Sequence, residues 1–338
     1  MMKEKRKTSF CLRLTAFLLA GVLFFGLTWL AGWLLMPQRK EYGSLWEQYR
    51  SEPKDSLDVL FFGSSIVYCD IAPGWIWEES GLRSWVMAGP EQTMALTYYY
   101  VREAQKTQSP RLMVLEASSL LFRKYQDYSR ANVSSMPLGP NRLAAVFRAA
   151  EWAEWKGLVF PLYNYHARWT EIQRWEAKEH LLPALDALAG YTPLARSIPQ
   201  TPRINRDRVP EEETYRENLV WLKRIGDLCQ KKGVRLLVYL APSAARTQKE
   251  ITERIGTDIQ ALGLEFLDLS DIAPELSVDD ELDWYDPLHF NIRGAEKFSR
   301  WWGRTLAKEL APDQEADRES WEQRLRELER RREELLSE

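Results

Sequence analysis

An uncharged apolar run near the N-terminus constrains this chain more than any other feature. Residues 14–36 read LTAFLLAGVLFFGLTWLAGWLLM, with no charged side chain, and about 20 such residues span the hydrocarbon core of a bilayer as a helix. Residues 1–13 carry five basic side chains and one acidic one. The positive-inside tendency therefore predicts a protein of the cell membrane whose N-terminus is cytoplasmic and whose residues after 36 are extracytoplasmic.

A cleaved signal peptide is the alternative to a retained signal anchor. The apolar region of a signal peptide runs for about 7–15 residues and ends in small residues at the cleavage site. The run at 14–36 is longer and ends in Trp-Leu-Leu-Met-Pro, which favours a retained single-pass anchor. No second run approaches this length, so the part after residue 36 is predicted to be a water-soluble domain tethered to the outer face.

Composition narrows the function classes of that domain. The 338 residues include 46 Lys and Arg against 49 Asp and Glu, a net charge of −3, whereas nucleic-acid binding needs a basic footprint. Three cysteines and three histidines are too few for a disulfide-stapled scaffold or a Cys-rich metal centre. We therefore expect no nucleic-acid partner, no metal and no cofactor, and leave open whether Cys69 and Cys229 pair.

Five short apolar runs predict buried parallel strands. Each run is continuous rather than alternating, which is typical of strands that are covered on both faces. Helical periodicity between the runs predicts a doubly wound α/β fold. The predicted strands lie at 57–62, 84–88, 111–117, 234–241 and 264–269, and the predicted helices at 93–107, 211–232, 248–262 and 293–310.

Three segments fall outside this alternation. Residues 37–56 are polar and predict a linker, so the folded domain is expected over 57–312. Residues 118–210 are too long for a structureless loop, and we expect a largely helical insertion over one end of the sheet, with helices around 141–155 and 170–182. Residues 313–338 predict a highly charged helix, with a solvated helix as the favoured interpretation and a partner-docking helix as the alternative.

The residues that follow the predicted strands are the candidates for chemistry, because open α/β sheets bind ligands at the carboxyl ends of their strands. Ser65 follows the first strand at a turn into a helix, and Asp286 and His289 lie three apart in a loop after the fifth. A serine hydroxyl is a weak nucleophile unless a base accepts its proton and a carboxylate orients that base. These three residues supply such a set, with Ser64 and Asp283 as the alternative serine and carboxylate.

The segments Asp58-Val-Leu-Phe-Phe-Gly63-Ser64-Ser65 and Asp286-Pro-Leu-His289 resemble the SGNH (GDSL-like) hydrolase superfamily. The resemblance implies a three-layer α/β/α, flavodoxin-like fold with a five-stranded parallel sheet. It also implies that Ser65 is the nucleophile, that His289 is its base and that Asp286 orients His289.

Other positions match that family in part. Ser64 stands in place of the family's aspartate and is a candidate for substrate binding. Gly89 falls where the family's second block supplies an oxyanion donor beside the N–H of the nucleophile, Ser65. The asparagine of the third block is missing, because Glu116-Ala-Ser118-Ser119 occupies its place. Ser118 or Ser119 is the expected substitute, and Ser118 is also a candidate for substrate binding.

The Gly-Ser-Ser form, the anchor and the insertion look more like one bacterial branch of the superfamily, the membrane-anchored proteins of teichoic-acid D-alanylation and alginate-type O-acetylation. That branch works on a cell-surface polysaccharide with a membrane-bound O-acyltransferase as partner. Residues 161–169 (PLYNYHARW) also resemble a stretch of this branch. His166 and Arg168 are therefore candidates for substrate or partner contacts, with a packed aromatic cluster as the alternative interpretation.

The predicted function is that of a membrane-anchored extracytoplasmic serine acyltransferase or esterase. Its expected substrate is an O-acyl group, with acetyl as the expected acyl, on a cell-surface glycan. The insertion favours a transferase, because transfer requires that water be excluded and an acceptor positioned. The alternative is a non-catalytic scaffold that binds the glycan or the acyltransferase.

Overall fold

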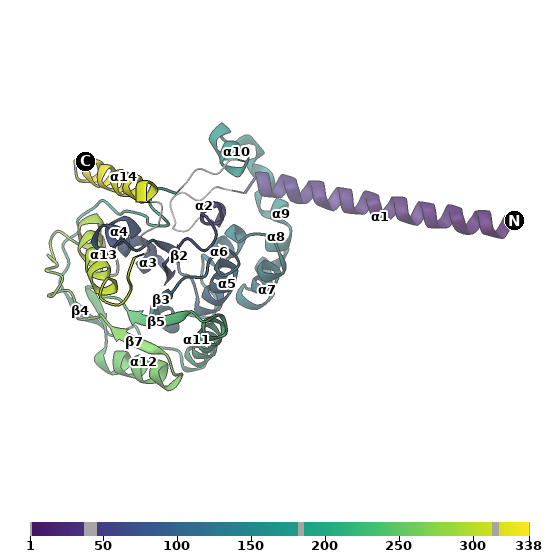
Figure 1. The fold of residues 1–338 in the computed structure, drawn as a ribbon. Helices are drawn as coiled ribbons and strands as arrows, with labels where there is room; N and C mark the ends of the chain where they lie inside the picture. The colour runs from purple at the N-terminus through teal and green to yellow at the C-terminus, as the bar shows by residue number, and fades with distance from the viewer. Residues whose placement is uncertain (1, 37–45, 182–185, 313–317, 338) are drawn as a thin grey trace. The chain divides into compact units, whose positions relative to one another are not determined.

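The computed structural model describes residues 2–36, 46–181, 186–312 and 318–337 (Figure 1). The chain divides into two compact units. The N-terminal unit combines Met1–Gln38 with Trp152–Pro183, and the sheet unit combines Arg39–Glu151 with Ala184–Glu338. The predicted insertion at 118–210 is therefore shared between the two units.

The N-terminal unit is built on one long helix, α1 (Met2–Leu34). Among the described residues, one helix, Phe10–Leu34, is long and apolar enough to cross a membrane, as a membrane anchor or a signal sequence would be. The other elements of this unit are short. They are η2 (Trp152–Glu154), α8 (Trp155–Val159), α9 (Pro161–Tyr165), η3 (His166–Thr170) and α10 (Arg174–Leu181).

The sheet unit contains the predicted five-stranded parallel sheet, in the flavodoxin-like order β2-β1-β3-β5-β7. All five predicted strands are confirmed, with their ends within two residues of those predicted. They are β1 (Val59–Gly63), β2 (Ser84–Ala88), β3 (Leu112–Glu116), β5 (Arg235–Leu240) and β7 (Glu265–Asp268). Gly63 of β1 pairs with Ala88 of β2, and Glu116 of β3 pairs with Tyr239 of β5, so the carboxyl ends of the strands meet at one edge.

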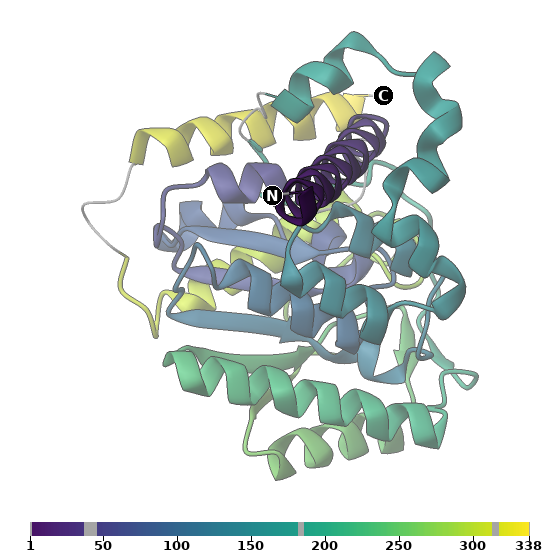
Figure 2. The same cartoon turned by 90° about the vertical axis from the view of Figure 1, so that its right-hand side faces the viewer.

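Helices cover both faces of this sheet, which gives the predicted three-layer α/β/α architecture (Figures 1 and 2). The predicted helices are confirmed, and their ends carry recognisable stop signals. The Thr93 hydroxyl accepts a hydrogen bond from the N–H of Leu96 at the start of α5, and Gly233 ends α11 in the left-handed conformation. One layer contains α3 (Ser65–Asp70), α4 (Pro73–Ser80) and α13 (Ile292–Leu306), and the other contains α5 (Met94–Ala104), α11 (Glu212–Lys232) and α12 (Lys249–Ala261).

The remaining elements of the sheet unit are short and surround this core. A second sheet of two parallel strands, β4 and β6, was not predicted from the sequence. Cys69 on α3 and Cys229 on α11 are free, buried thiols, so the structure leaves them unpaired. The short elements are α2 (Trp46–Ser51), η1 (Ala117–Leu121), α6 (Ser129–Ser135), α7 (Pro140–Ala149), β4 (Arg203–Asn205) and β6 (Ala245–Thr247).

Part of the predicted linker is a packed helix instead. Residues 37–45 lie outside the described residues, but α2 buries Trp46 and Tyr49 almost completely. Their rings meet edge-on at 5.8 Å, and Trp46 also contacts Tyr100 of α5. Residues 37–56 are polar on average, so their composition predicts a linker despite these two aromatic side chains. Burial of the two rings against α5 stabilises the helical turn that carries them.

The C-terminal helix α14 (Arg318–Ser337) is also packed within the sheet unit, so the expectation of a solvated helix is wrong. Trp321 and Leu328 are buried, and Leu328 lies against Gly74 of α4. Arg324 forms a buried ion pair with Glu52. The apolar stripe of α14 is therefore buried against the sheet unit, and the one charged side chain buried with it, Arg324, is paired with Glu52.

Large aromatic side chains fill the core beneath α13. Trp302 is fully buried, and its ring lies 5.7 Å from that of Phe61 on β1 and 5.2 Å from that of Tyr239 on β5. Its neighbour Trp301 is only partly buried and donates a hydrogen bond to Glu275. Trp302 therefore joins α13 to two strands of the sheet.

We expect Trp302→Ala to lower the free energy of unfolding by about 3–5 kcal/mol, the usual cost of the cavity left by a large core side chain. Urea unfolding of the full chain in detergent, followed by circular dichroism, measures this change. Trp301→Ala is the matched control and is expected to cost less. Equal losses for the two variants would contradict the assignment of Trp302 as the core residue.

Candidate active site

The candidate site begins where β1 ends and α3 starts. Gly63 closes β1, and a Cβ at this position would lie 2.4 Å from Val67 Cγ2 and 3.0 Å from the Cβ of Glu116. Glycine is therefore required for the strand to turn so closely into the helix. This turn places Ser65 at the first position of α3, where its side chain is partly exposed.

The structure brings together the three residues that the sequence analysis singled out. His289 Nε2 lies 2.8 Å from Ser65 Oγ, and His289 Nδ1 lies 2.8 Å from Asp286 Oδ2. Ser65 and His289 are separated by 224 positions in the chain. The arrangement has the geometry of a serine nucleophile, its base and the carboxylate that orients the base.

Asp286 holds His289 through several contacts at once. Its Oδ1 also accepts hydrogen bonds from the backbone N–H groups of Leu288 and His289, at 2.7 and 2.9 Å. Burial alone would raise the pKa of Asp286, but these hydrogen bonds and the His289 side chain hold it below its ordinary value. Asp286 is thus a stable anion beside the imidazole.

The alternative carboxylate, Asp283, has a different role. It is almost fully buried and forms an ion pair with Lys297 of α13 at 2.6 Å. Its Oδ2 also accepts the backbone N–H of Asp279. The structure therefore favours Asp286 over Asp283 as the partner of His289.

The loop that carries His289 is fixed from both sides. Trp284 and Phe290 stack with ring centroids 4.3 Å apart. Asn291 caps the start of α13 and donates to the carbonyl of Leu282 at 2.6 Å. The backbone N–H of Phe290 donates to Asp70 Oδ1 at 3.0 Å, so a residue of α3 positions the histidine loop against the same helix that begins with Ser65.

Asp70 is a site residue that sequence reasoning missed. It is completely buried, and burial raises its pKa well above the ordinary value, against the Phe290 hydrogen bond. Its Oδ2 has no hydrogen-bond partner among the described residues. The sequence shows that Asp70 follows Ser65 by five residues, but it contains no signal that Asp70 contacts Phe290.

The predicted oxyanion donors lie at neighbouring strand ends. Ser65 is at the N-terminus of α3, where the first backbone N–H groups lack partners within the helix. Gly89 directly follows Ala88, which pairs with Gly63. The register therefore places both positions at the same edge of the sheet.

An asparagine does lie next to Gly89, although no sequence pattern predicts it. Asn132 of α6 is completely buried, and its Oδ1 would lie 2.4 Å from a Cβ at position 89. Its Nδ2 donates to the carbonyl of Pro90 at 2.8 Å, and its own carbonyl accepts the Tyr100 hydroxyl at 2.9 Å. Asn132 thus ties the Gly89–Pro90 turn to α6 and excludes any larger residue at position 89.

The two serines proposed for substrate binding are both buried. Ser64 precedes α3, and its hydroxyl has no hydrogen-bond partner among the described residues. The N–H and the hydroxyl of Ser118 both donate to Glu116. The Ser118 hydroxyl could donate to a substrate only if its hydrogen bond to Glu116 broke.

Glu116 lies where the resemblance predicts an asparagine. Burial raises the pKa of Glu116, and the Ser118 hydrogen bonds and the charge of Arg208 oppose that rise. The segment that carries Arg208 follows β4, which pairs with β6, and Ala245 of β6 donates to the carbonyl of Pro287. The charge of Arg208, a residue that was not among the predicted site residues, therefore acts on the buried carboxyl of Glu116.

His166 and Arg168, the other two candidates, belong to the N-terminal unit. The Arg168 guanidinium donates to both carboxylate oxygens of Glu176 at 3.0 Å and to the carbonyl of Leu35 at 2.6 Å. These contacts give Arg168 a structural role within its unit. His166 is exposed, with Nδ1 3.2 Å from the carbonyl of Tyr163, and its binding role stays a prediction.

The buried carboxyl of Asp70 predicts a pH dependence of stability. Because its pKa is raised in the folded state, this group stabilises the fold fully at low pH, and its contribution is lost as the pH rises from the unfolded value of about 3.9 toward the folded value. Asp70→Asn removes this loss and keeps an acceptor for Phe290. We expect the stability of the variant relative to the unsubstituted chain to increase from pH 4.5 to pH 8 in urea unfolding.

The exposed Asp127→Asn is the matched control and is expected to show a constant difference over the same range. A constant difference for Asp70→Asn as well would contradict a raised pKa at Asp70.

Solved structures include a distant likeness to this chain. A solved structure described as a "putative acylhydrolase" from Bacteroides fragilis is 13% identical, with a TM-score of 0.36, over 78% of this chain and 93% of that one. No protein family and no curated protein matches the sequence. A likeness at this level says nothing of the activity or substrate of this chain.

Proposed function

We propose that this protein is an SGNH-type serine acyl-transfer enzyme with Ser65, His289 and Asp286 as its catalytic residues. The observation that carries the proposal is the position of His289, whose two ring nitrogens lie 2.8 Å from Ser65 Oγ and 2.8 Å from Asp286 Oδ2. A histidine held between a hydroxyl and a carboxylate in this way is the arrangement that activates a serine.

The geometry assigns a role to each atom. Asp286 accepts a hydrogen bond from the Nδ1–H of His289, which leaves the unprotonated Nε2 free to accept the proton of the Ser65 hydroxyl. Ser65 Oγ then forms a bond to the acyl carbon, and His289 passes the proton to the leaving alcohol oxygen as the ester bond breaks. In the second half-reaction an acceptor hydroxyl loses its proton to His289 and takes the acyl group, and the proton returns to Ser65.

When Ser65 attacks the acyl carbon, negative charge develops on the carbonyl oxygen of the substrate. Hydrogen-bond donors beside Ser65 are needed to stabilise that charge. We assign this role to the backbone N–H groups of Ser65 and Gly89, with Asn132 as a positioning residue that holds the Gly89 turn. Backbone donors of this kind are rigid, so they need not reorganise as the charge develops.

The identity of the acceptor separates the two forms of the activity. Water as acceptor makes the protein an esterase, and a sugar hydroxyl makes it a transferase. The family resemblance and the apolar helix α1 support an extracytoplasmic site that is anchored by residues 14–36, acts on O-acetyl groups of a cell-surface glycan and works beside a membrane-bound O-acyltransferase. The alternative, a non-catalytic scaffold for the same glycan or acyltransferase, leaves the Ser65–His289 contact unexplained.

Covalent labelling tests the proposed nucleophile. We expect a fluorophosphonate to add once to the full chain in detergent, at Ser65, because His289 activates that hydroxyl. Intact mass and peptide mapping measure the adduct. Ser65→Ala and His289→Ala should abolish it, and Ser64→Ala, which changes the neighbouring buried serine, should retain it. An adduct at Ser64 would move the nucleophile to that serine, whereas no adduct in the unsubstituted chain would refute the assignment and favour the scaffold.

Substitution of the orienting carboxylate tests the mechanism. We expect Asp286→Asn to lower kcat for p-nitrophenyl acetate hydrolysis by about 10⁴-fold, because the amide selects the wrong imidazole tautomer. Asp283→Asn removes a nearby carboxylate that pairs with Lys297 instead. Its rate per folded molecule should be unchanged, and a comparable loss in both variants would argue against a specific role for Asp286.

A further inference from the structure

Within the N-terminal unit, the helices after residue 152 pack along the C-terminal third of α1. A Cβ at Gly32 would lie 2.4 Å from the backbone nitrogen of Leu162, so the two backbones touch at this point. The rings of Phe25 and Phe160 lie 6.3 Å apart. The hydrogen bond from Arg168 to the carbonyl of Leu35 closes the far end of the contact.

These contacts place Phe160 at a definite depth along α1. Phe25 precedes Leu34, the last residue of the candidate span, by nine residues, or roughly 14 Å of helix. The hydrocarbon core of a bilayer is about 30 Å thick, so each leaflet contributes about 15 Å. If α1 spans a membrane as proposed, Phe160 lies at a depth that only hydrocarbon occupies.

The segment from residue 152 to residue 170 has the surface that such a position requires. Four of its aromatic side chains, Trp152, Phe160, Tyr163 and Trp169, are between 50% and 76% exposed. The segment contains only three charged side chains. Exposed Trp and Tyr of this kind are typical of the boundary between lipid and water, where the ring is apolar and its polar atom is wet.

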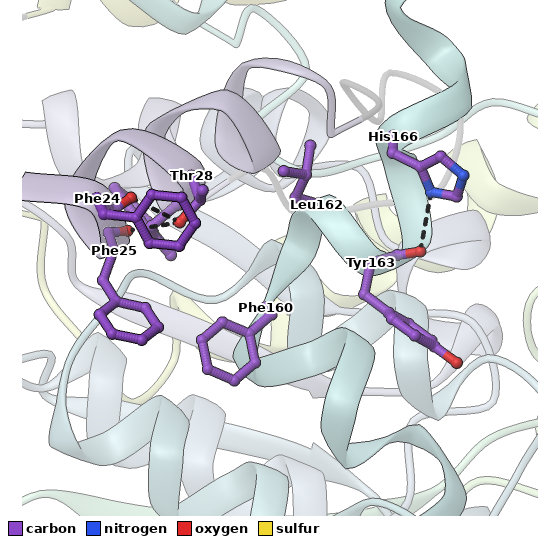
Figure 3. Close-up of a pocket in the computed structure, with 8 residues that line it drawn as sticks. Phe24, Phe25, Thr28, Phe160, Leu162, Tyr163 and His166 are labelled. Carbon is purple, nitrogen blue, oxygen red and sulfur yellow. Dashed lines mark hydrogen bonds between the residues drawn. The ribbon is translucent and has the colours of Figure 1, made fainter. Parts of the chain in front are cut away.

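A groove of about 660 Å³ runs between this segment and α1 (Figure 3). Phe24, Phe25, Phe160 and Leu162 line its apolar part, and Figure 3 shows Phe25 and Phe160 side by side, with Tyr163 and His166 toward the other end. One wall of the groove is the exposed face of α1 itself. Whatever covers α1 therefore also covers the groove.

We propose that residues 152–170 insert into the outer leaflet of the membrane and that this groove takes an acyl chain of a phospholipid. The inference rests on the proposed placement of α1 across the bilayer. An acyl chain suits the apolar part of the groove, and the exposed His166 and Tyr163 suit the polar headgroup level. The segment thereby acts as a second point of attachment, beside α1, between the protein and the lipid surface.

Site-directed spin labelling of the full chain in phosphatidylcholine–phosphatidylglycerol vesicles tests this inference. The background is Cys11→Ser, because Cys69 and Cys229 are buried. Labels are attached at Phe160→Cys and, as a second groove position, at Tyr163→Cys. Collision with oxygen, which concentrates in lipid, is compared with collision with a water-soluble nickel chelate.

Two further labels serve as references. Phe17→Cys lies on α1 and is 76% exposed, and Val220→Cys lies on α11 of the sheet unit beside Arg216 and Glu217. We expect the oxygen-to-nickel collision ratio at position 160 to match that at position 17 and to exceed that at position 220 several-fold. Position 163 should give an intermediate ratio.

Each other outcome overturns a distinct claim. A lipid-like ratio at position 17 with a water-like ratio at 160 and 163 refutes the inserted segment while the anchor stands. Water-like ratios at all positions refute the proposed anchor itself. Protection of positions 160 and 163 from both reagents shows that protein, such as a second copy of the chain, covers the groove instead of lipid.

Discussion

The contact between His289 and Ser65 depends on the register of the parallel sheet. Because β1 pairs with β2 and β3 in the same direction, the turns after Gly63, Ala88 and Glu116 all emerge at one edge. Because β7 is parallel to β5, the loop between β7 and α13 also starts from this edge, and its residue Phe290 contacts Asp70 of α3. A hydrogen bond across 224 positions thus follows from strand order.

Buried polar groups hold this edge together. Asp70 accepts a hydrogen bond from the backbone N–H of Phe290, and Glu116 accepts two from Ser118. Asn132 donates one to the carbonyl of Pro90 in the turn after Gly89. Each of these side chains is fully or almost fully buried, so each hydrogen bond is costly to leave unmade. Such contacts give the loops one well-defined position, which a nucleophile and its base require if they are to stay within hydrogen-bond distance.

Much of the sheet unit could be predicted because local patterns and the global fold agree. Continuous apolar runs such as 57–62 belong to strands that are buried on both faces, and stop signals such as Gly233 fall where helices end. Predictions failed where a few large apolar residues are buried although the composition of their segment is polar or charged. Trp46 and Tyr49 turn a polar stretch into a packed helix, and Trp321 and Leu328 bury one face of a highly charged one.

The sequence by itself determined the α/β class, the strand positions, one apolar helix long enough to span a membrane and the three residues of the proposed triad. These features depend on continuous apolar runs and on short motifs, both of which are formed by residues close together in the chain. Only the tertiary structure decided that Asp286 rather than Asp283 holds His289, that Asp70 and Asn132 support the site, and that residues 152–183 belong with α1. These are contacts between segments far apart in the chain, and no local pattern specifies which partner a side chain will meet once the helices and strands have packed.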